Sequence, residues 1–322
     1  MKTQKIVVLG TGGTIAGTAA NASDNVGYIA AQVTVENLAQ AVPSLASLAT
    51  SCELVFEQVA QIDSKDMGFA VWLQLARRVA ECLADADIQG VVITHGSDTL
   101  EETAYFLQLL LQPSKPVVLT CAMRPATALV PDGPQNMVDA VVVARHAGAQ
   151  GVVAVCAGRI HSAEDVRKVH PYRLDAFDSR DAGVLGYVEE GTVRLVRDWP
   201  LAKQAPKLAR LNHLPEEPAV WPWVEIVCSH TGATAVLINL LARSGVKGIV
   251  LAATGNGTLH QSLDDALPAV QAQGVRLVRV SGCALGQMIG VPGLQQDASY
   301  LGLSPAKARI RLMLELMRDS KA

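Results

Sequence analysis

The sequence predicts an α/β protein with a large amino-terminal domain and a smaller carboxyl-terminal α/β domain. Short apolar runs rich in β-branched residues alternate with longer segments of helical period, which is typical of βα units and of a mostly parallel open sheet with helices on both faces. The length of 322 residues suits about two domains. With 50% apolar and 18% charged residues, the composition excludes a largely disordered chain.

The first half of the chain contains five runs that are long enough for buried strands and too short for helices. They are Ile6–Leu9, Leu54–Val59, Val91–Thr94, Val117–Thr120 and Val152–Val155. The segments between them have helical period, namely Val35–Val42, Asp66–Leu83, Asp98–Leu111 and Gln135–His146. This alternation predicts an amino-terminal domain over residues 1–197.

A proline-rich, charged segment interrupts the alternation at residues 198–223 and is predicted to be an inter-domain linker. The pattern then resumes in residues 224–322, the predicted second domain. Its expected strands are Val224–Cys228, Ile249–Ala253 and Val275–Val280, and its expected helices are Thr231–Arg243, Leu263–Gln273 and Pro305–Met317.

Charge and cysteine content limit the partners that we expect. A formal net charge of −3 offers no broad attraction for nucleic acid. The six cysteines have no zinc-site spacing, so we expect reduced core thiols and no metal. No apolar run approaches the roughly 18 residues of a membrane span. The first apolar run, at the amino terminus, ends at Gly10 and is too short for the apolar region of a signal peptide. We therefore expect a cytoplasmic protein without membrane association.

Polar residues and glycines follow four of the predicted strands. In an open parallel sheet, ligands bind beyond the carboxyl ends of the strands, so these residues are the candidate site. The four segments are Gly10–Thr14, Asp63–Asp66, Thr94–Thr99 and Thr120–Pro125.

The glycines after the first strand also allow two other interpretations. A dinucleotide-binding GxGxxG pattern started at Gly10 requires a third glycine where Ile15 stands, which disfavours a nucleotide-dependent oxidoreductase. Alternatively, the glycines only form a tight turn. In a third interpretation, backbone N–H groups exposed beside the glycines stabilise a developing oxyanion, and the hydroxyl of either Thr11 or Thr14 is the nucleophile.

The segment after the third strand has its own structural alternative. Ser97 and Asp98 precede Glu101 and Glu102, which is typical of a capped helix start, so capping alone can explain them. For His95 the sequence favours a hydrogen-bonded core histidine over a catalytic one.

Several motifs together resemble the bacterial L-asparaginase family, which includes the glutaminase-asparaginases. The two most specific are TGGT at residues 11–14 and THGSDT at residues 94–99. Further matches follow in order along nearly the whole chain: VTVENLAQAVP, SKDM, VVLTCAMRPAT, DGPQN, AATGNGTL and SPAKARI. The resemblance implies hydrolysis of L-asparagine to L-aspartate and ammonia without a cofactor or metal. It also implies a homotetramer, built as a pair of dimers, whose active sites combine two subunits.

The resemblance assigns the catalytic roles to particular positions of this sequence. Thr14 corresponds to the nucleophile, and Tyr28 corresponds to the tyrosine of a loop that closes over the substrate. Ser97, Asp98 and Lys168 correspond to a hydroxyl, carboxylate and lysine that act together, although the run Arg167–Lys168 alone would suggest a solvated surface.

The same resemblance implies the substrate contacts. Ser64 and Asp98 would hold the α-carboxylate and α-ammonium groups of asparagine, and the Ala122 carbonyl would accept a hydrogen bond from its amide. Lys65 and Ser97 belong to the same expected set of substrate-binding residues. Asn256 would come from the neighbouring subunit.

Two features depart from the family pattern. Lys65 stands where many relatives have Gln or Glu, and the segment Gly282–Gln296 has no acidic residue. A lysine beside the substrate ammonium would repel it, which predicts a higher KM for asparagine than in relatives with Gln.

These observations favour an asparagine amidohydrolase. Two alternatives of other classes are the oxidoreductase considered above and a non-catalytic amino-acid-binding module.

Overall fold

A computed structural model describes residues 4–48, 52–200, 211–290 and 297–320. The chain divides into two compact units, residues 1–207 and 208–322, and each is described here by itself. Part of the predicted linker, residues 201–210, lies outside the described residues.

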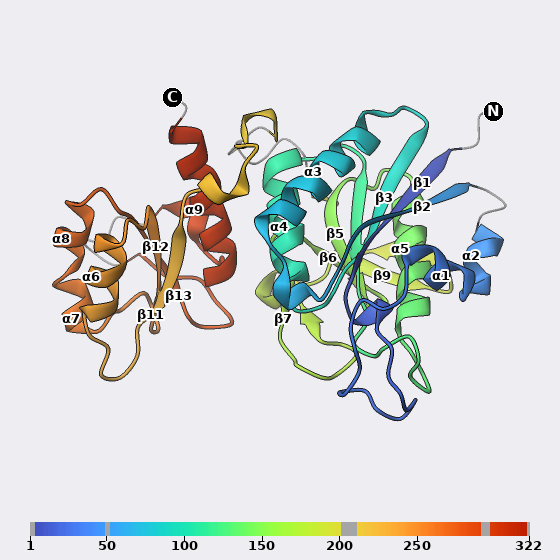
Figure 1. Cartoon of the computed structure of the whole chain (residues 1–322), viewed down its shortest axis with the longest axis horizontal. Helices are drawn as coiled ribbons and strands as arrows, with labels where there is room; N and C mark the ends of the chain where they lie inside the picture. The colour runs from blue at the N-terminus through green and yellow to red at the C-terminus, as the bar shows by residue number, and fades with distance from the viewer. Residues whose placement is uncertain (1–3, 49–51, 201–210, 291–296, 321–322) are drawn as a thin grey trace. The chain divides into compact units, whose positions relative to one another are not determined.

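The amino-terminal unit is built on an eight-stranded sheet in the order β10-β9-β6-β5-β4-β3-β1-β2 (Figure 1). Five of these strands are parallel and contain the five predicted strands. They are β1 (Lys5–Gly12), β2 (Glu53–Ile62), β3 (Ile88–Thr94), β4 (Pro116–Thr120) and β5 (Gly151–Cys156). The predicted mostly parallel sheet is therefore confirmed.

The remaining strands of this unit are antiparallel and were not predicted. Strands β6 (Arg159–Ser162), β9 (Gly186–Glu189) and β10 (Thr192–Leu195) extend the large sheet beyond β5. A separate two-stranded ladder joins β7 (Arg167–Lys168) to β8 (Phe177–Asp178). These strands are two to four residues long and carry charged side chains, so no apolar run marks them.

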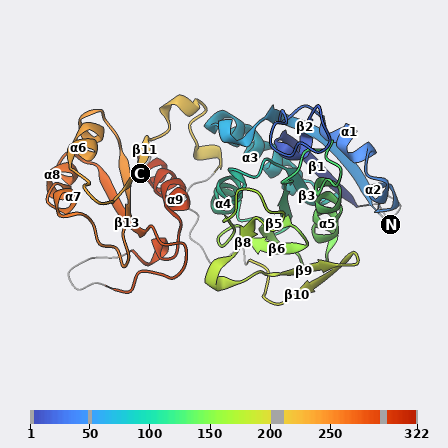
Figure 2. The same ribbon diagram turned by 90° about the horizontal axis from the view of Figure 1, so that it is seen from below.

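Helices cover both faces of the large sheet, as predicted (Figure 2). The longer ones are α3 (Phe69–Ala84), α4 (Leu100–Leu111) and α5 (Gly133–Arg145), and the short ones are α1 (Val35–Gln40) and α2 (Pro43–Leu48). Helices α3 and α4 pack together on one face, where Trp72 stacks on Phe106 with ring centroids 4.7 Å apart. Helices α1 and α5 cover the opposite face, against alternate residues of the strands such as Ile6 and Val8.

The carboxyl-terminal unit contains a three-stranded parallel sheet in the order β11-β12-β13. Its strands are β11 (Val224–Cys228), β12 (Gly248–Ala253) and β13 (Arg276–Ser281). The long helix α9 (Pro305–Asp319) lies on one face, and α6 (Val236–Arg243), α7 (Gln261–Asp264) and α8 (Leu267–Gln271) lie on the other (Figure 1). The predicted helix Leu263–Gln273 is divided into α7 and α8 near Pro268, which lacks a donor for a continuous helix.

The cysteines correct one expectation. All six thiols are free, and Cys52, Cys82, Cys121 and Cys156 are buried as predicted. Cys228 and Cys283 are exposed, because each lies at or just beyond the end of a strand of the small sheet.

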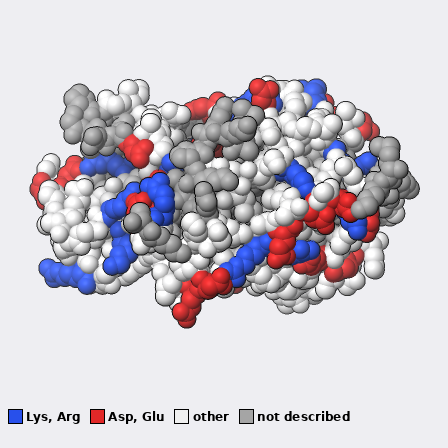
Figure 3. Space-filling view, turned by 90° about the horizontal axis from the view of Figure 1, so that it is seen from above, with Lys and Arg blue, Asp and Glu red and all other residues white. Residues whose placement is uncertain are grey.

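Acidic and basic side chains lie beside each other on the face seen in Figure 3. The carboxyl-terminal unit contains ion pairs of Arg276 with Glu315 and Asp319, at 2.8 and 2.7 Å. Among residues 4–48, 52–200, 211–290 and 297–320, no helix is both long and apolar enough to span a membrane.

Candidate active site

The TGGT loop leaves β1 through two glycines that adopt a backbone conformation disfavoured for other residues, with φ of 98° at Gly12 and 83° at Gly13. A Cβ atom on Gly13 would lie only 2.3 Å from the Cα atom of Gly96. The loops after β1 and β3 therefore touch at a point where neither can carry a side chain. This contact brings the chain next to Thr14 close to the chain next to Ser97.

Thr14 begins a short 3-10 turn, Thr14–Ala16, and its side chain is buried against the next loop. Its hydroxyl oxygen lies 2.7 Å from the phenolic oxygen of Tyr28. Tyr28 is held in place by a pair of backbone hydrogen bonds, each 2.9 Å long, between Thr18 and Ile29. The pairing of Thr18 with Ile29 thus places the Tyr28 hydroxyl within hydrogen-bonding distance of the Thr14 hydroxyl.

Thr11, the other threonine of the motif, has a different environment. It is buried, and its hydroxyl donates to the Thr94 carbonyl on the neighbouring strand at 3.0 Å. Its hydroxyl therefore joins β1 to β3, while the Thr14 hydroxyl is paired with another hydroxyl. This difference distinguishes the two threonines that the sequence left as alternatives.

Lys168 reaches the loop after β3 from a strand 70 residues further along the chain. Its ammonium donates to the Ser97 hydroxyl at 2.8 Å and to the Asp98 carboxylate at 2.6 Å. The Lys168 side chain is 18% exposed, so it is not the solvated lysine that its basic neighbour suggested. The Lys168 ammonium is therefore within hydrogen-bonding distance of both other side chains that are predicted to act with it.

The capping interpretation of this segment is wrong. Helix α4 has Thr99 as its N-cap, and no side-chain hydrogen bond caps it. The Thr99 hydroxyl instead donates to the Ser64 carbonyl at 2.8 Å. Ser97 and Asp98 therefore lie outside the helix and are paired with Lys168.

Ser64 occupies a buried position between the loops after β2 and β3. Its hydroxyl accepts a hydrogen bond from the Asp98 backbone N–H at 3.2 Å. A Cβ atom on Gly96 would lie 2.4 Å from this hydroxyl, so glycine is required for the approach. The structure thus brings Ser64 next to Asp98, the other residue expected to bind the ends of an amino acid.

Lys65, which the sequence predicts to repel the substrate ammonium, has two acidic partners in the structure. Its ammonium lies 2.7 Å from the Asp63 carboxylate and 3.6 Å from that of Asp66, and 63% of the side chain is exposed. The hydrogen bond to Asp63, followed by the charge of Asp63, raises the pKa of Lys65. The two nearby acids offset its charge, which sequence reasoning missed because it sought an acid only in distant segments.

The loop after β4, which contains Ala122, is held by two residues of the DGPQN motif. The Asp132 carboxylate accepts hydrogen bonds from the backbone N–H groups of Met123 and Arg124, each at 2.9 Å. The Asn136 side-chain amide donates to the Cys121 carbonyl at 2.9 Å. The peptides on both sides of Ala122 are therefore fixed. The DGPQN motif resembles the family pattern, but nothing in the sequence alone predicts this role for Asp132 and Asn136.

His95 is a hydrogen-bonded core histidine, as predicted. It is fully buried, with Nδ1 2.7 Å from the Gly96 carbonyl and Nε2 2.9 Å from the Thr103 hydroxyl. The carbonyl can only accept, so Nδ1 carries the proton and Nε2 accepts from Thr103. Burial lowers the pKa of His95 to about 4, which keeps the ring neutral near pH 7.

Asn256 lies in the carboxyl-terminal unit, after β12. Its side-chain amide donates to the Ile289 carbonyl at 2.9 Å and accepts from the Ile289 N–H at 2.6 Å. Both ends of the amide therefore hold the loop that follows β13. The segment predicted to lack an acid, Gly282–Gln296, continues into residues 291–296, which lie outside the described residues.

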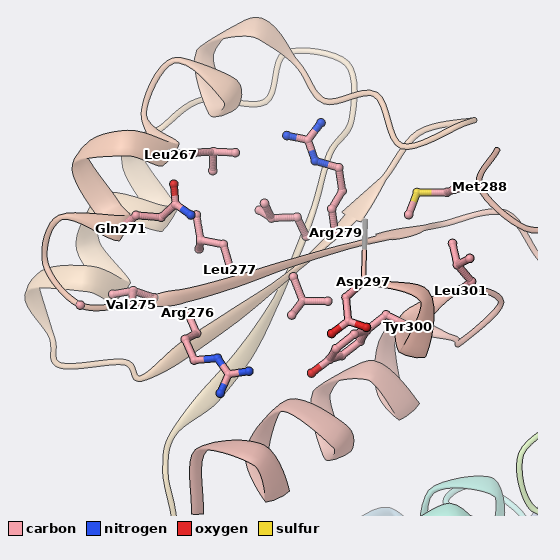
Figure 4. A pocket seen from close by; sticks show the side chains of 13 residues that line it. Leu267, Gln271, Val275, Arg276, Leu277, Arg279, Met288, Asp297, Tyr300 and Leu301 are labelled. Carbon is pink, nitrogen blue, oxygen red and sulfur yellow. The ribbon is translucent and has the colours of Figure 1, made fainter. Parts of the chain in front are cut away.

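A pocket of about 790 Å³ lies beside β13 in the same unit, and residues of this strand line it (Figure 4). Its two arginines are already paired: Arg279 contacts Asp264 at 2.6 Å, and Arg276 contacts Glu315 at 2.8 Å. The hydroxyl of Tyr300 also donates to Glu315, at 2.7 Å. The polar groups of this pocket therefore serve the packing of the unit, and we place no chemistry in it.

Metal chemistry has no evident ligand set in the part of the chain that the structure describes. No three side chains of His, Cys, Asp or Glu are grouped there so that they could hold an ion.

Comparison with known proteins identifies the family. Residues 5–201 match the family described as "Asparaginase, N-terminal", and residues 223–322 match the "Glutaminase/Asparaginase C-terminal domain". A glutaminase-asparaginase of Pseudomonas fluorescens biotype A is 37% identical, over 99% of this chain and 89% of its own. L-asparaginase 2 of Escherichia coli (strain K12) is also 37% identical, over 97% of this chain and 88% of its own.

A solved structure shows the same fold. The crystal structure of a probable cytoplasmic L-asparaginase from Campylobacter jejuni has a TM-score of 0.90 and 37% sequence identity, and the match covers 98% of this chain and 96% of that one. The two domain matches together span nearly all the described residues. This protein belongs to the asparaginase family.

Proposed function

We propose that this protein hydrolyses L-asparagine to L-aspartate and ammonia, with Thr14 as the nucleophile. The observation that carries the proposal is the 2.7 Å contact between the Thr14 and Tyr28 hydroxyls, beside the linked group of Ser97, Asp98 and Lys168. Family membership and the names of its relatives, L-asparaginase and glutaminase-asparaginase, support the same reaction.

In this mechanism Thr14 Oγ1 attacks the side-chain amide carbon of asparagine. Tyr28 accepts a hydrogen bond from the Thr14 hydroxyl and so increases its nucleophilicity. The C–N bond breaks, and the leaving nitrogen takes up the proton that the Thr14 hydroxyl has lost and departs as ammonia. Water then attacks the acyl carbon, the bond to the threonine oxygen breaks, and one proton of the water returns to Thr14 Oγ1 as the carboxyl group of aspartate forms and ionises. The Ser97 hydroxyl, hydrogen-bonded to Lys168, is the second group that can pass protons during these steps.

Substrate selection in this proposal depends on the two charged ends of an amino acid. Asp98 binds the α-ammonium group and Ser64 binds the α-carboxylate, while the Ala122 carbonyl accepts from the substrate amide. An amide without an α-ammonium group gives the exposed Asp98 carboxylate no charge partner beyond Lys168, which disfavours its binding relative to asparagine. Lys65 is left out of this set, because its ammonium is paired with Asp63.

We further propose a cytoplasmic homotetramer, built as a pair of dimers, in which Asn256 of one subunit completes the site of another. The proposed domains are residues 1–197 and 224–322, joined by the linker 198–223. Large apolar side chains near the Thr14 loop support a subunit contact, since they are strongly exposed. They are Val26, Ile29, Leu129 and Val130, at 65–76% exposure. The word "cytoplasmic" in the name of the Campylobacter protein supports the location.

One assay separates the proposed function from its alternatives. Release of ammonia from L-asparagine, at a rate that saturates with substrate, is the expected result. Binding of a nicotinamide nucleotide without ammonia release would indicate the oxidoreductase, and saturable asparagine binding without turnover would indicate a binding module.

A mixing experiment tests the shared site. Thr14→Ala and Asn256→Ala variants are each expected to be inactive, and exchange of their subunits should restore part of the activity through hybrid sites. Full activity in a monomer would rule out the shared site while leaving the reaction itself in place.

A further inference from the structure

Lys168 is held at its main chain as well as at its ammonium, by residues at the start of one helix. Its side chain contacts Ser97 and Asp98, and its backbone N–H donates to the Glu101 carboxylate at 2.6 Å. Glu101 stands in the first turn of α4, three residues after Asp98. The segment 97–101 therefore fixes both the beginning and the end of the lysine side chain.

The strand that carries Lys168 has little support of its own. Strand β7 contains two residues, and its one partner among the strands of the described residues is β8, which also contains two. This ladder is separate from the eight-stranded sheet. Beyond it, the Val169 and His170 N–H groups share one acceptor, the Ala176 carbonyl, at 2.8 and 3.3 Å. The backbone of Lys168 thus depends on a contact with a stronger element to keep its place.

Helix α4 is such an element. Its buried residues include Leu100, Phe106 and Leu107, all fully excluded from solvent. A hydrogen bond from an N–H group to a carboxylate is stronger than one between neutral groups. Glu101 therefore joins the weak β7 ladder to the rigid core of the unit, directly at the residue whose ammonium reaches Ser97.

We propose that Glu101 is a positioning residue for Lys168, an inference that rests on the role of Lys168 in the proposed function. The carboxylate of Glu101 places the lysine backbone so that the side chain reaches Ser97 and Asp98 together. A lysine side chain has four rotatable bonds, so freeing its backbone spreads the ammonium over many positions. Misplacement of a catalytic group by about 1 Å can reduce turnover about 100-fold.

Glu101 also has a structural alternative, because an acidic residue in the first turn of a helix stabilises it through the helix dipole. Glu102 occupies the same turn and provides the matched control. Glu102→Gln removes a charge from the same turn and leaves in place the Glu101 carboxylate that accepts from the Lys168 N–H. Glu101→Gln removes the charge and keeps an oxygen that can accept from the Lys168 N–H, whereas Glu101→Ala removes both.

The test compares asparagine hydrolysis in these three variants. For Glu101→Ala we expect kcat to fall about 10- to 100-fold with KM within about threefold of the wild type. Glu101→Gln should recover kcat to within about fivefold of the wild type, since the acceptor remains, and Glu102→Gln should match the wild type. Equal losses of kcat in Glu101→Gln and Glu101→Ala, or no loss in either, would overturn the positioning role.

Combination with Lys168→Met separates this inference from the proposed function. In the Lys168→Met background, Glu101→Ala should reduce kcat by less than about twofold further, because there is no ammonium left to position. An undiminished additional loss would overturn the inference and indicate a general structural role. Wild-type activity in Lys168→Met itself would contradict the proposed role of the lysine, whatever the Glu101 variants do.

Discussion

The two units each contain a cluster of charged and hydroxyl side chains, and the clusters differ in how completely their hydrogen-bonding groups are used. In the carboxyl-terminal unit, Glu315 is 6% exposed and accepts from Arg276, Arg311 and Tyr300 at 2.7–3.0 Å. In the amino-terminal unit, Lys168 joins Ser97 to Asp98, whose side chain is 53% exposed. We call the first group the closed cluster, because its polar groups pair with one another; it contains Arg276, Tyr300, Arg311 and Glu315. We call the second group the open cluster, because its carboxylate is exposed to solvent; it contains Ser97, Asp98 and Lys168.

This difference follows from where the residues stand. The members of the closed cluster come from a strand, a helix and the turn before it, and pack α9 against the small sheet. In the open cluster, Ser97 and Asp98 come from the loop beyond the carboxyl end of β3, which is a usual ligand position in such sheets, and Lys168 reaches them from β7. We therefore expect changes in the closed cluster to lower stability and changes in the open cluster to lower activity.

The largest expected effect is on activity at Thr14. Thr14→Ala should keep the fold and lower kcat for asparagine by at least about three orders of magnitude, because the attacking oxygen is gone. Thr14→Ser should keep a measurable fraction. Steady-state ammonia release measures kcat of each variant, and thermal unfolding shows whether the fold is kept.

Thr11 offers the matched control for Thr14. Thr11→Val removes a buried hydroxyl that bonds to Thr94, so it should cost about 1 kcal/mol of stability with kcat little changed. If Thr11→Val lost most of its kcat while Thr14→Ala remained active, the nucleophile would be Thr11 and not Thr14.

The second prediction concerns the open cluster as a unit. Ser97→Ala and Lys168→Met should each lower kcat by about 10²- to 10⁴-fold, and the double variant should lose little more than the worse single one. Ser97→Thr retains the hydroxyl and should remain active. Losses that add in free energy would show that the two residues act separately.

The closed cluster should show the reverse pattern. Glu315→Gln leaves Arg276 and Arg311 without their buried carboxylate and should lower the free energy of unfolding by about 3 kcal/mol. Asp319→Asn removes a partly exposed partner of Arg276 and should cost less than about 1 kcal/mol. Chemical denaturation measures both, and kcat of the folded enzyme should stay near that of the wild type. A selective loss of kcat in Glu315→Gln would remove the distinction between the clusters.

The sequence predicts the features of these regions that depend on neighbouring residues, and it does not predict the contacts between residues that are far apart along the chain. The buried strands were predictable because each is a continuous apolar run, such as Val91–Thr94. The pairing of Lys168 with Asp98 was expected only from the family resemblance, because β7 is two polar residues long and no local pattern ties it to position 98. Local reasoning offered helix capping as an equally good explanation of Ser97 and Asp98. The role of Glu101 was hidden because its partner is a backbone N–H group 67 residues away.

His95 lies beside the open cluster and should nevertheless act on stability alone. Its pKa is about 4 when folded and 6.5 in the reference state, so the unfolded chain binds more protons between these values. Its contribution to stability is complete above pH 6.5 and is lost as the pH falls toward 4. From pH 7.5 to pH 5 the loss should be about 2 kcal/mol. Denaturation of the wild type and of His95→Gln at both pH values measures this, and the variant should lack that part of the pH dependence.

The smallest expected effect is at Lys65, where the contacts of the lysine lead to a different prediction from that of the sequence. The sequence alone suggested that Lys65→Gln would lower KM by removing a cation near the substrate ammonium. The Lys65 ammonium is paired with Asp63 at 2.7 Å and largely exposed, so its field is offset by its partner and screened by solvent. We therefore expect Lys65→Gln to change KM for asparagine by less than about twofold. Asp63→Asn sharpens the test: it removes the offsetting charge and should raise KM more than Lys65→Gln lowers it. A several-fold fall of KM in Lys65→Gln, measured at low salt, would restore the repulsion and place Lys65 with the open cluster.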